Sequence, residues 1–164
     1  MPEIKGFSHV QLTVSSSDRA SRWWQEVMGF TEVIRYRRDA WEAVSLLHPN
    51  GMTVGLMDYD DSTDDRFDER RTGLDHLSFE VSDRDELTKW VTHLDTKGVE
   101  HSGINDTDFG PIVAFRDPDN IQLEFFVHPR VDQVTELLTD GNSEEARRML
   151  DEAELRSKSQ GEAI

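Results

Sequence analysis

The sequence predicts an α+β fold made of two tandem βαβββ modules and a C-terminal helical tail. Two observations predict it. Residues 7–15 resemble residues 74–82 at an offset of 67. The Pro-Asn-Gly turn at 49–51 matches the Pro-Asp-Asn turn at 118–120 at an offset of 69. Because the two offsets nearly agree, both halves are expected to repeat one order of elements.

Local signals place the elements within each copy. Ser17 or Asp18 suits the N-cap of the first helix, and Gly29 suits its C-terminal end. In the second copy Ser82 or Asp83 suits the N-cap, and Gly98 suits the C-terminal end. The expected elements of the first copy are strand 7–14, helix 18–28 and strands 31–38, 41–48 and 52–59; those of the second are strand 74–81, helix 84–97 and strands 99–103, 111–116 and 121–127.

Four regions follow from this reading: a first module over 1–60, an acidic linker over 61–72, a second module over 73–128 and a helical extension over 129–164. The linker holds several aspartates, a composition typical of solvated chain, and is given no functional role. The extension carries apolar residues at helical spacing and predicts one or two helices interrupted near Gly141.

Composition excludes several classes of function. The chain has 164 residues, with 34 acidic and 18 basic side chains, and its formal net charge is −16. This charge repels phosphate backbones and anionic membrane surfaces, so neither nucleic acid nor a membrane is an expected partner. The absence of cysteine excludes disulfides, thiolate metal sites and a cysteine nucleophile. No apolar run is long enough to span a bilayer and no secretory signal opens the chain, so a cytoplasmic location is expected.

Strand alternation identifies three side chains that could act as metal ligands. Side chains of a strand alternate between its two faces, so His9 and His76 lie on the strand faces turned away from the helices. Glu124 lies on the corresponding mixed face of the last strand. A single histidine or glutamate on a strand is more often a bystander than a ligand. Two histidines at one repeated position, with a carboxylate, instead favour a divalent metal site with positions open to water or substrate.

These features resemble the vicinal oxygen chelate superfamily, which includes glyoxalase I, extradiol dioxygenases and the fosfomycin- and bleomycin-resistance proteins. The resemblance rests on the paired modules, on His9, on the Gly-Leu-Asp-His-Leu run at 73–77, and on the Phe-Arg-Asp-Pro-Asp run at 115–119 that leads to Glu124. It implies a cup-shaped mixed sheet formed by the two modules and a metal at its base held by His9, His76 and Glu124. It also implies a substrate that binds the metal through adjacent oxygens, and a homodimer.

Departures from the individual branches narrow the expected chemistry. Glyoxalase I uses a fourth ligand at the position of Gly55, which has no side chain, so this activity is not expected. Three ligands match the extradiol dioxygenases, but Ala114 stands at their tyrosine position and no histidine lies in 105–113. Fosfomycin-type enzymes need a cationic loop, which 99–113 does not offer. Bleomycin-type binders fit the acidic charge but leave a complete ligand set unexplained.

The sequence therefore predicts a metal-dependent protein that acts on a small oxygen-chelating molecule. The leading hypothesis is a dioxygenase-like oxidoreductase with Fe(II), although Mn(II), Zn(II), Ni(II) and Co(II) are also compatible with the ligand set. The alternatives are a resistance-type protein that binds or sequesters a small molecule without turnover, and a non-redox lyase or isomerase. No catalytic acid or base is assigned. The expected substrate-binding residues are Gln11, Thr13, Met57, Ser78 and Phe126.

Overall fold

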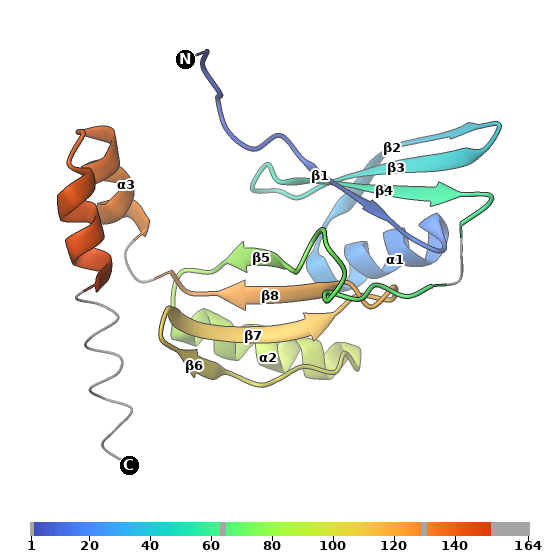
Figure 1. Ribbon diagram of the computed structural model, residues 1–164. Coiled ribbons are helices and arrows are strands. Elements are labelled where there is room, and N and C mark those ends of the chain that lie inside the picture. Colours follow the sequence, from blue (N-terminus) through green and yellow to red (C-terminus); the bar gives the residue numbers. More distant parts are fainter. Residues whose placement is uncertain (1, 63–64, 129–130, 152–164) are drawn as a thin grey trace. The chain divides into compact units, whose positions relative to one another are not determined.

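A computed structural model describes residues 2–62, 65–128 and 131–151, and contains two four-stranded mixed sheets. Their strand orders are β1-β4-β3-β2 and β5-β8-β7-β6. One helix accompanies each sheet, α1 the first and α2 the second (Figure 1). The elements are β1 Val10–Thr13, α1 Ser17–Met28, β2 Thr31–Arg38, β3 Trp41–Leu47, β4 Thr53–Tyr59, β5 Leu77–Glu80, α2 Arg84–Lys97, β6 Asn105–Thr107, β7 Gly110–Arg116, β8 Gln122–Phe126 and α3 Val131–Thr139.

The expected pair of βαβββ modules with a C-terminal helix is confirmed. In each sheet the strand before the helix pairs in parallel with the last strand of its module, β1 with β4 and β5 with β8. Strands β2, β3 and β4 pair antiparallel in sequence order. Beyond α3 a second helical stretch begins at residue 143 and continues to 151, the last described residue. The closure of the two sheets into one cup stays a prediction.

Both helices end at the expected glycines and α2 begins at an expected cap, Asp83, but the cap of α1 is Ser16 and not Ser17 or Asp18 as predicted. The Ser16 side chain accepts a hydrogen bond from the backbone N–H of Arg19, and the Asp83 side chain accepts one from Glu86. Gly29 and Gly98 take left-handed backbone conformations at the C-terminal ends, with φ of 74° and 67°. These local contacts satisfy backbone groups that a helix leaves unpaired at its ends.

Three strand predictions were wrong at their boundaries. Strands 7–14 and 74–81 were expected, but β1 covers only Val10–Thr13 and β5 only Leu77–Glu80. The parallel pairing with β4 and β8 begins only at Val10 and Leu77, so the residues before them are not part of the strands. The strand expected at 99–103 is reduced to an isolated bridge between His101 and Phe115, and β6 forms later, in the hairpin with β7. His9 and His76 therefore each lie one residue before a strand.

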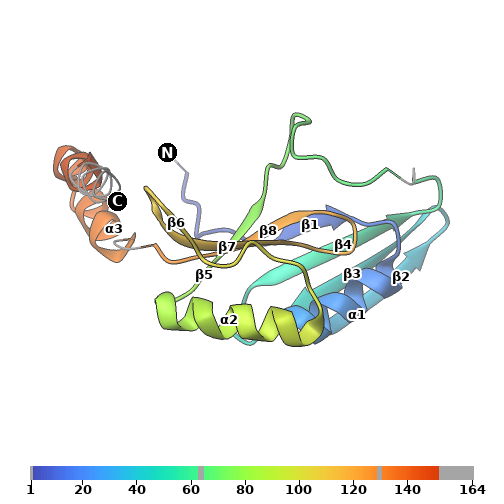
Figure 2. The same ribbon diagram turned by 90° about the horizontal axis from the view of Figure 1, so that it is seen from below.

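Each unit buries its own apolar core between helix and sheet. In the first, Trp24 of α1 is fully buried with Leu46 and Leu56, and its ring meets Phe30 edge-on at a centroid distance of 5.4 Å. In the second, α2 lies along one face of the sheet (Figure 2), and Trp90 stacks on Phe125 at 4.1 Å. Helix packing therefore leaves the opposite face of each sheet for the remaining side chains.

A polar network joins the start of α1 to the sheet. The Ser17 backbone N–H donates to Asp58 Oδ2 at 2.9 Å, and the Ser21 hydroxyl donates to Glu32 at 2.6 Å. Arg35 forms ion pairs with Asp18, Glu32 and Glu42. Its hydrogen bond lowers the pKa of Glu32, and the surrounding acids raise the pKa of Arg35. One guanidinium thus compensates the carboxylates gathered on this side of the sheet.

The chain divides into two compact units. The first contains the described residues up to Asp75 together with Arg116–Gln122, and the second contains His76–Phe115 with the described residues from Leu123 onward. The Asp-Pro-Asp-Asn turn at 117–120 therefore groups with the first unit, although it joins β7 to β8.

Candidate functional site

The first unit presents three of the expected substrate-binding residues on one face of its sheet. Leu12 is buried on the α1 side of β1, so its neighbours Gln11 and Thr13 face the other way and are exposed. The parallel register places Gln11 beside Gly55 and Thr13 beside Met57. Gln11 Nε2 also lies 3.6 Å from Met57 Sδ, a distance at which a weak hydrogen bond to sulfur forms.

The second unit brings two of the three expected metal ligands together. His76 Nε2 lies 3.4 Å from Glu124 Oε1, and the Glu124 side chain is only 14% exposed. The strand register pairs Glu124 with Ser78 and Phe126 with Glu80. Leu123 and Phe125 are buried on the helix side, so Glu124 and Phe126 lie on the opposite face with Ser78.

His9 belongs to the first unit, just before β1, where it is exposed and its Nδ1 lies 3.1 Å from the Ser8 hydroxyl. Within residues 2–62, 65–128 and 131–151, no three His, Asp or Glu side chains form a group that could hold a metal ion. The gathering of His9 with His76 and Glu124 therefore stays a prediction.

The His76–Glu124 pair fits a divalent metal by its donor chemistry. A neutral imidazole and a carboxylate together suit borderline cations such as Fe(II), Mn(II) or Zn(II). The register holds Glu124 in the interior of the sheet, beside Ser78, where its backbone is fixed by strand pairing. Such a pair can supply part of a coordination shell and leave other positions to further ligands.

The other histidines have structural surroundings. His48 packs on the Phe30 ring at 5.1 Å, His93 on Trp90 at 5.4 Å, and His128 on Phe126 at 5.5 Å. His101 Nε2 lies 3.1 Å from Asp95 Oδ1, and its Nδ1 accepts the Gly103 backbone N–H.

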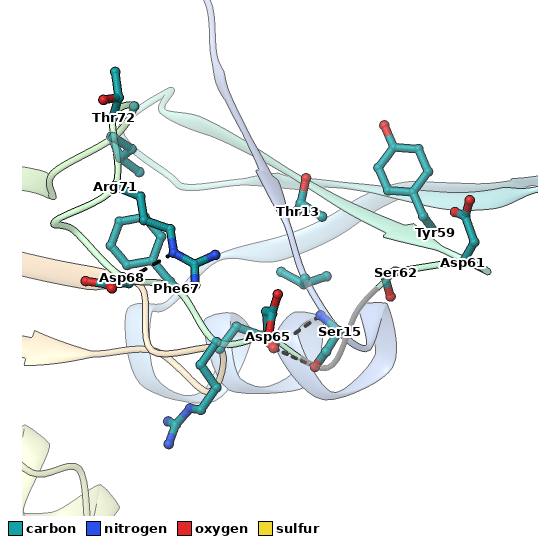
Figure 3. A pocket seen from close by; sticks show the side chains of 15 residues that line it. Thr13, Ser15, Tyr59, Asp61, Ser62, Asp65, Phe67, Asp68, Arg71 and Thr72 are labelled. Carbon is teal, nitrogen blue, oxygen red and sulfur yellow. Dashed lines mark hydrogen bonds and ion pairs between the residues drawn. The ribbon is translucent and has the colours of Figure 1, made fainter.

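A pocket of about 460 Å³ lies within the first unit, between the ends of β1 and β4 and the segment after β4. Figure 3 shows Thr13 and Tyr59 on one side and Phe67 and Arg71 on the other. Thr13 is the one expected substrate-binding residue that lines it. The lining is otherwise mixed: Val14, Ser15, Asp61, Ser62, Asp65, Arg66, Asp68, Thr72, Gly73, Leu74 and Asp119.

Sequence reasoning missed this pocket because it treated the linker as solvated chain. The half-buried Phe67, inside an acidic run, was the signal that could have indicated packing. Its backbone N–H donates to Asp119 O at 3.0 Å, and its carbonyl accepts from Asn120 Nδ2 at 2.7 Å. Arg116 Nη1 and Nη2 donate hydrogen bonds to the two Glu69 carboxylate oxygens at 2.9 and 3.0 Å. This pairing lowers the pKa of Glu69 to about 2.

Two buried aspartates hold the turn at 117–120. Asp119 Oδ1 accepts from the Ser15 backbone N–H at 3.1 Å, from the Ser15 hydroxyl and from Arg19 at 2.8 Å. Asp117 Oδ1 accepts the backbone N–H groups of Asp119 and Ile121 at 2.9 and 2.8 Å. Burial raises the pKa of Asp117 to about 6, and the neighbouring charge of Asp119 adds to the shift. These acids stabilise a turn rather than line the face with Glu124.

A family model described as the Glyoxalase/Bleomycin resistance protein/Dioxygenase superfamily matches residues 6–125. The chain belongs to this superfamily.

Solved structures share the fold. A glyoxylase/bleomycin resistance protein/dioxygenase domain from Frankia sp. EAN1pec is 37% identical, with a TM-score of 0.72 over 77% of this chain and 99% of that one. A variant of the fosfomycin resistance protein FosX from Listeria monocytogenes, complexed with Mn(II) and a dihydroxypropylphosphonic acid, is 21% identical. Its TM-score is 0.59 over 76% of this chain and 90% of that one, which establishes similarity of fold.

A curated relative carries a dioxygenase name. The protein named "Putative ring-cleaving dioxygenase MhqA", from Bacillus subtilis (strain 168), is 24% identical over 164 residues. The match covers 93% of this chain and 51% of the relative, so the chain spans about half the length of that protein. Among the described residues, none of the helices combines the length and the apolar character needed to cross a bilayer.

Proposed function

We propose that this chain is a metal-dependent vicinal oxygen chelate protein that acts on a small oxygen-chelating molecule, as a dioxygenase-like oxidoreductase. The observation that carries the proposal is the pairing of His76 Nε2 with Glu124 Oε1 at 3.4 Å on the open face of the second sheet. The family membership and the dioxygenase name of a relative at 24% identity support the same class.

In this proposal His9, His76 and Glu124 hold one divalent cation, with Fe(II) favoured over Mn(II), Zn(II), Ni(II) and Co(II). Bound there, an iron ion would supply a Lewis acid and a means of activating dioxygen. Fe(II) is favoured because two imidazoles and one carboxylate are the donors typical of non-haem iron oxygenases.

The remaining work falls to this chain's own side chains. Glu124 Oε1 lies 3.4 Å from His76 Nε2, so these two donor atoms are close enough to share one cation. Ser78, which pairs with Glu124 in the register, and Phe126 on the same face orient the substrate in the second unit. Gln11, Thr13 and Met57 do so on the first, with a polar carboxamide and hydroxyl beside an apolar thioether.

The test is metal retention by a His76→Gln variant. The purified chain is loaded anaerobically with Fe(II), desalted and analysed for iron, with His93→Gln on α2 as the matched control. We expect the control to keep stoichiometric iron and His76→Gln to lose most of it, because one of three ligands is gone. Equal iron in the two variants would remove His76 from the ligand set. Oxygen uptake on catechols by the loaded wild-type protein then tests the dioxygenase assignment.

A binding protein without turnover is the second candidate. The observation that favours it is the pocket of about 460 Å³, whose lining includes none of the three expected metal ligands. Equilibrium dialysis with a small-molecule panel separates the two functions: a binder returns its ligand chemically intact whether or not oxygen is present. Product formed without oxygen would instead point to a lyase or isomerase. Light scattering of the purified chain tests the proposed homodimer.

A further inference from the structure

Gly55 is a glycine whose backbone does not require glycine. The other glycines of the described residues have φ values from 67° to 151°, a range that residues with a side chain rarely adopt. The φ of Gly55 lies outside that range. It is buried in β4, an interior strand of the first sheet. Glycine weakens a strand interior and often marks a place where another group approaches closely. The reason for glycine at 55 is therefore the space above it.

The Gln11 carboxamide fills that space. A Cβ built at position 55 would lie 2.1 Å from Gln11 Oε1, 2.6 Å from Cδ and 2.9 Å from Nε2. The whole amide plane thus lies across β4, with Nε2 directed at Met57 Sδ, 3.6 Å away. A side chain at 55 and the present position of the Gln11 amide exclude each other.

The surroundings of this amide define what it could bind. Across the sheet, Gly55 pairs with Ser45 and Met57 pairs with Ala43, so uncharged side chains, one of them a hydroxyl, neighbour the carboxamide on this face. Gln11 is exposed, and its Oε1 has no hydrogen-bond partner within the described part of the chain. An uncharged acceptor beside an alanine methyl and a methionine thioether suits a ligand with an apolar body and a hydroxyl group that donates to it.

We infer that Gln11 determines specificity on this face by accepting a hydrogen bond from a ligand hydroxyl, and that Gly55 is its positioning residue. The inference rests on the proposed function in one respect, that this ligand is the substrate. The inference adds that the substrate has an apolar body and a hydroxyl donor. It also gives a positioning role to Gly55, which has no side chain.

A double-mutant cycle tests the inference. Gln11→Ala, Gly55→Ala and the double variant are compared with wild type in the metal-free full chain, by ¹⁵N NMR titration. Catechol is the hydroxyl-bearing probe, toluene is the probe without a hydroxyl, and Thr31→Ala on β2 is the control. We expect each single variant to raise the catechol Kd by about three- to tenfold, the loss of one hydrogen bond. The double variant should be no weaker than either single one, because both remove the same contact.

Three results would overturn it: no catechol binding by wild type, an unchanged catechol Kd in Gln11→Ala, or losses that multiply in the double variant. Toluene affinity should stay constant; an equal loss for toluene would indicate a purely structural role. If Gly55→Ala folds poorly, the double variant can still be measured, because removal of the Gln11 amide leaves space for the Cβ at position 55. Metal-free protein also separates this outcome from that of His76→Gln, since iron retention plays no part in the titration.

Discussion

Replacing Asp117 by asparagine should change how stability depends on pH. Asp117 is 4% exposed, and burial, the largest cause, raises its pKa to about 6 from the ordinary 3.8. The backbone N–H groups of Ile121 and Asp119 and the Trp24 side chain oppose the shift, while the charge of Asp119 reinforces it. The net result is a carboxyl that the folded chain prefers to keep neutral.

The magnitude follows from the difference between the two states. The shift is 6 − 3.8, or about 2.2 units, which corresponds to about 3 kcal/mol at 1.36 kcal/mol per unit. Between pH 4 and pH 6 the folded state binds more protons at this site than the unfolded state, so stability falls as pH rises. Above pH 6 both states are ionised and the cost stays constant. Asparagine carries no charge at any of these values and keeps an oxygen for the two backbone donors.

The measurement is urea unfolding of wild type and Asp117→Asn at pH 4, 5, 6 and 7 and constant ionic strength. The stability of the variant relative to wild type should rise by about 2 kcal/mol from pH 4 to pH 7, because at pH 4 the carboxyl of the unfolded state is already more than half ionised. Asp39→Asn, in the exposed turn between β2 and β3, is the control and should follow wild type. Parallel pH profiles for wild type and Asp117→Asn would refute the reasoning.

Two further predictions concern the same turn and the segment before it. Asp119→Ala should lower the unfolding free energy by about 2 kcal/mol, because three donors lose a buried carboxylate. Arg19→Ala, whose side chain is 53% exposed, should cost clearly less; equal losses in urea unfolding would contradict the assignment. Glu69→Gln should speed tryptic cleavage in the 65–75 segment, because Arg116 loses its charged partner. An unchanged cleavage rate would show that other contacts hold this segment.

Local sequence signals were sufficient for the helices and the duplicated architecture. The helix predicted at 84–97 forms between the Asp83 cap and Gly98, because capping depends on neighbours within a few residues. Helix α1 likewise ends at Gly29, but it begins one residue before its expected start because its cap is Ser16 and not Ser17 or Asp18. Alternation also separated buried from open faces correctly in β1 and β8, since the pleat fixes a period of two along any strand.

Tertiary structure decided what depends on a partner distant in sequence. A strand extends only where its backbone pairs with a neighbour, and the paired registers of β1 and β5 cover four residues each, fewer than their apolar patterns suggested. The acidic linker packs about 50 residues away, on the end of β7 through Glu69 and Arg116 and on the following turn through Phe67. Composition alone predicts that such a segment is solvated, because it does not show that a basic side chain distant in sequence pairs with one of the acidic side chains.

The site shows the same division. From the chain alone, His76 and Glu124 could be nominated as ligands because a repeat and a strand period put them on open faces. Their approach to 3.4 Å required β5 and β8 to pair in one particular register. Gly55 is the clearest example. The sequence shows only that a fourth metal ligand is missing at this position, whereas in the folded sheet the Gln11 amide occupies the space where a side chain at 55 would lie. The type of a residue determines which chemical groups it offers. Only the packing of the folded chain determines which neighbouring group occupies the space beside it.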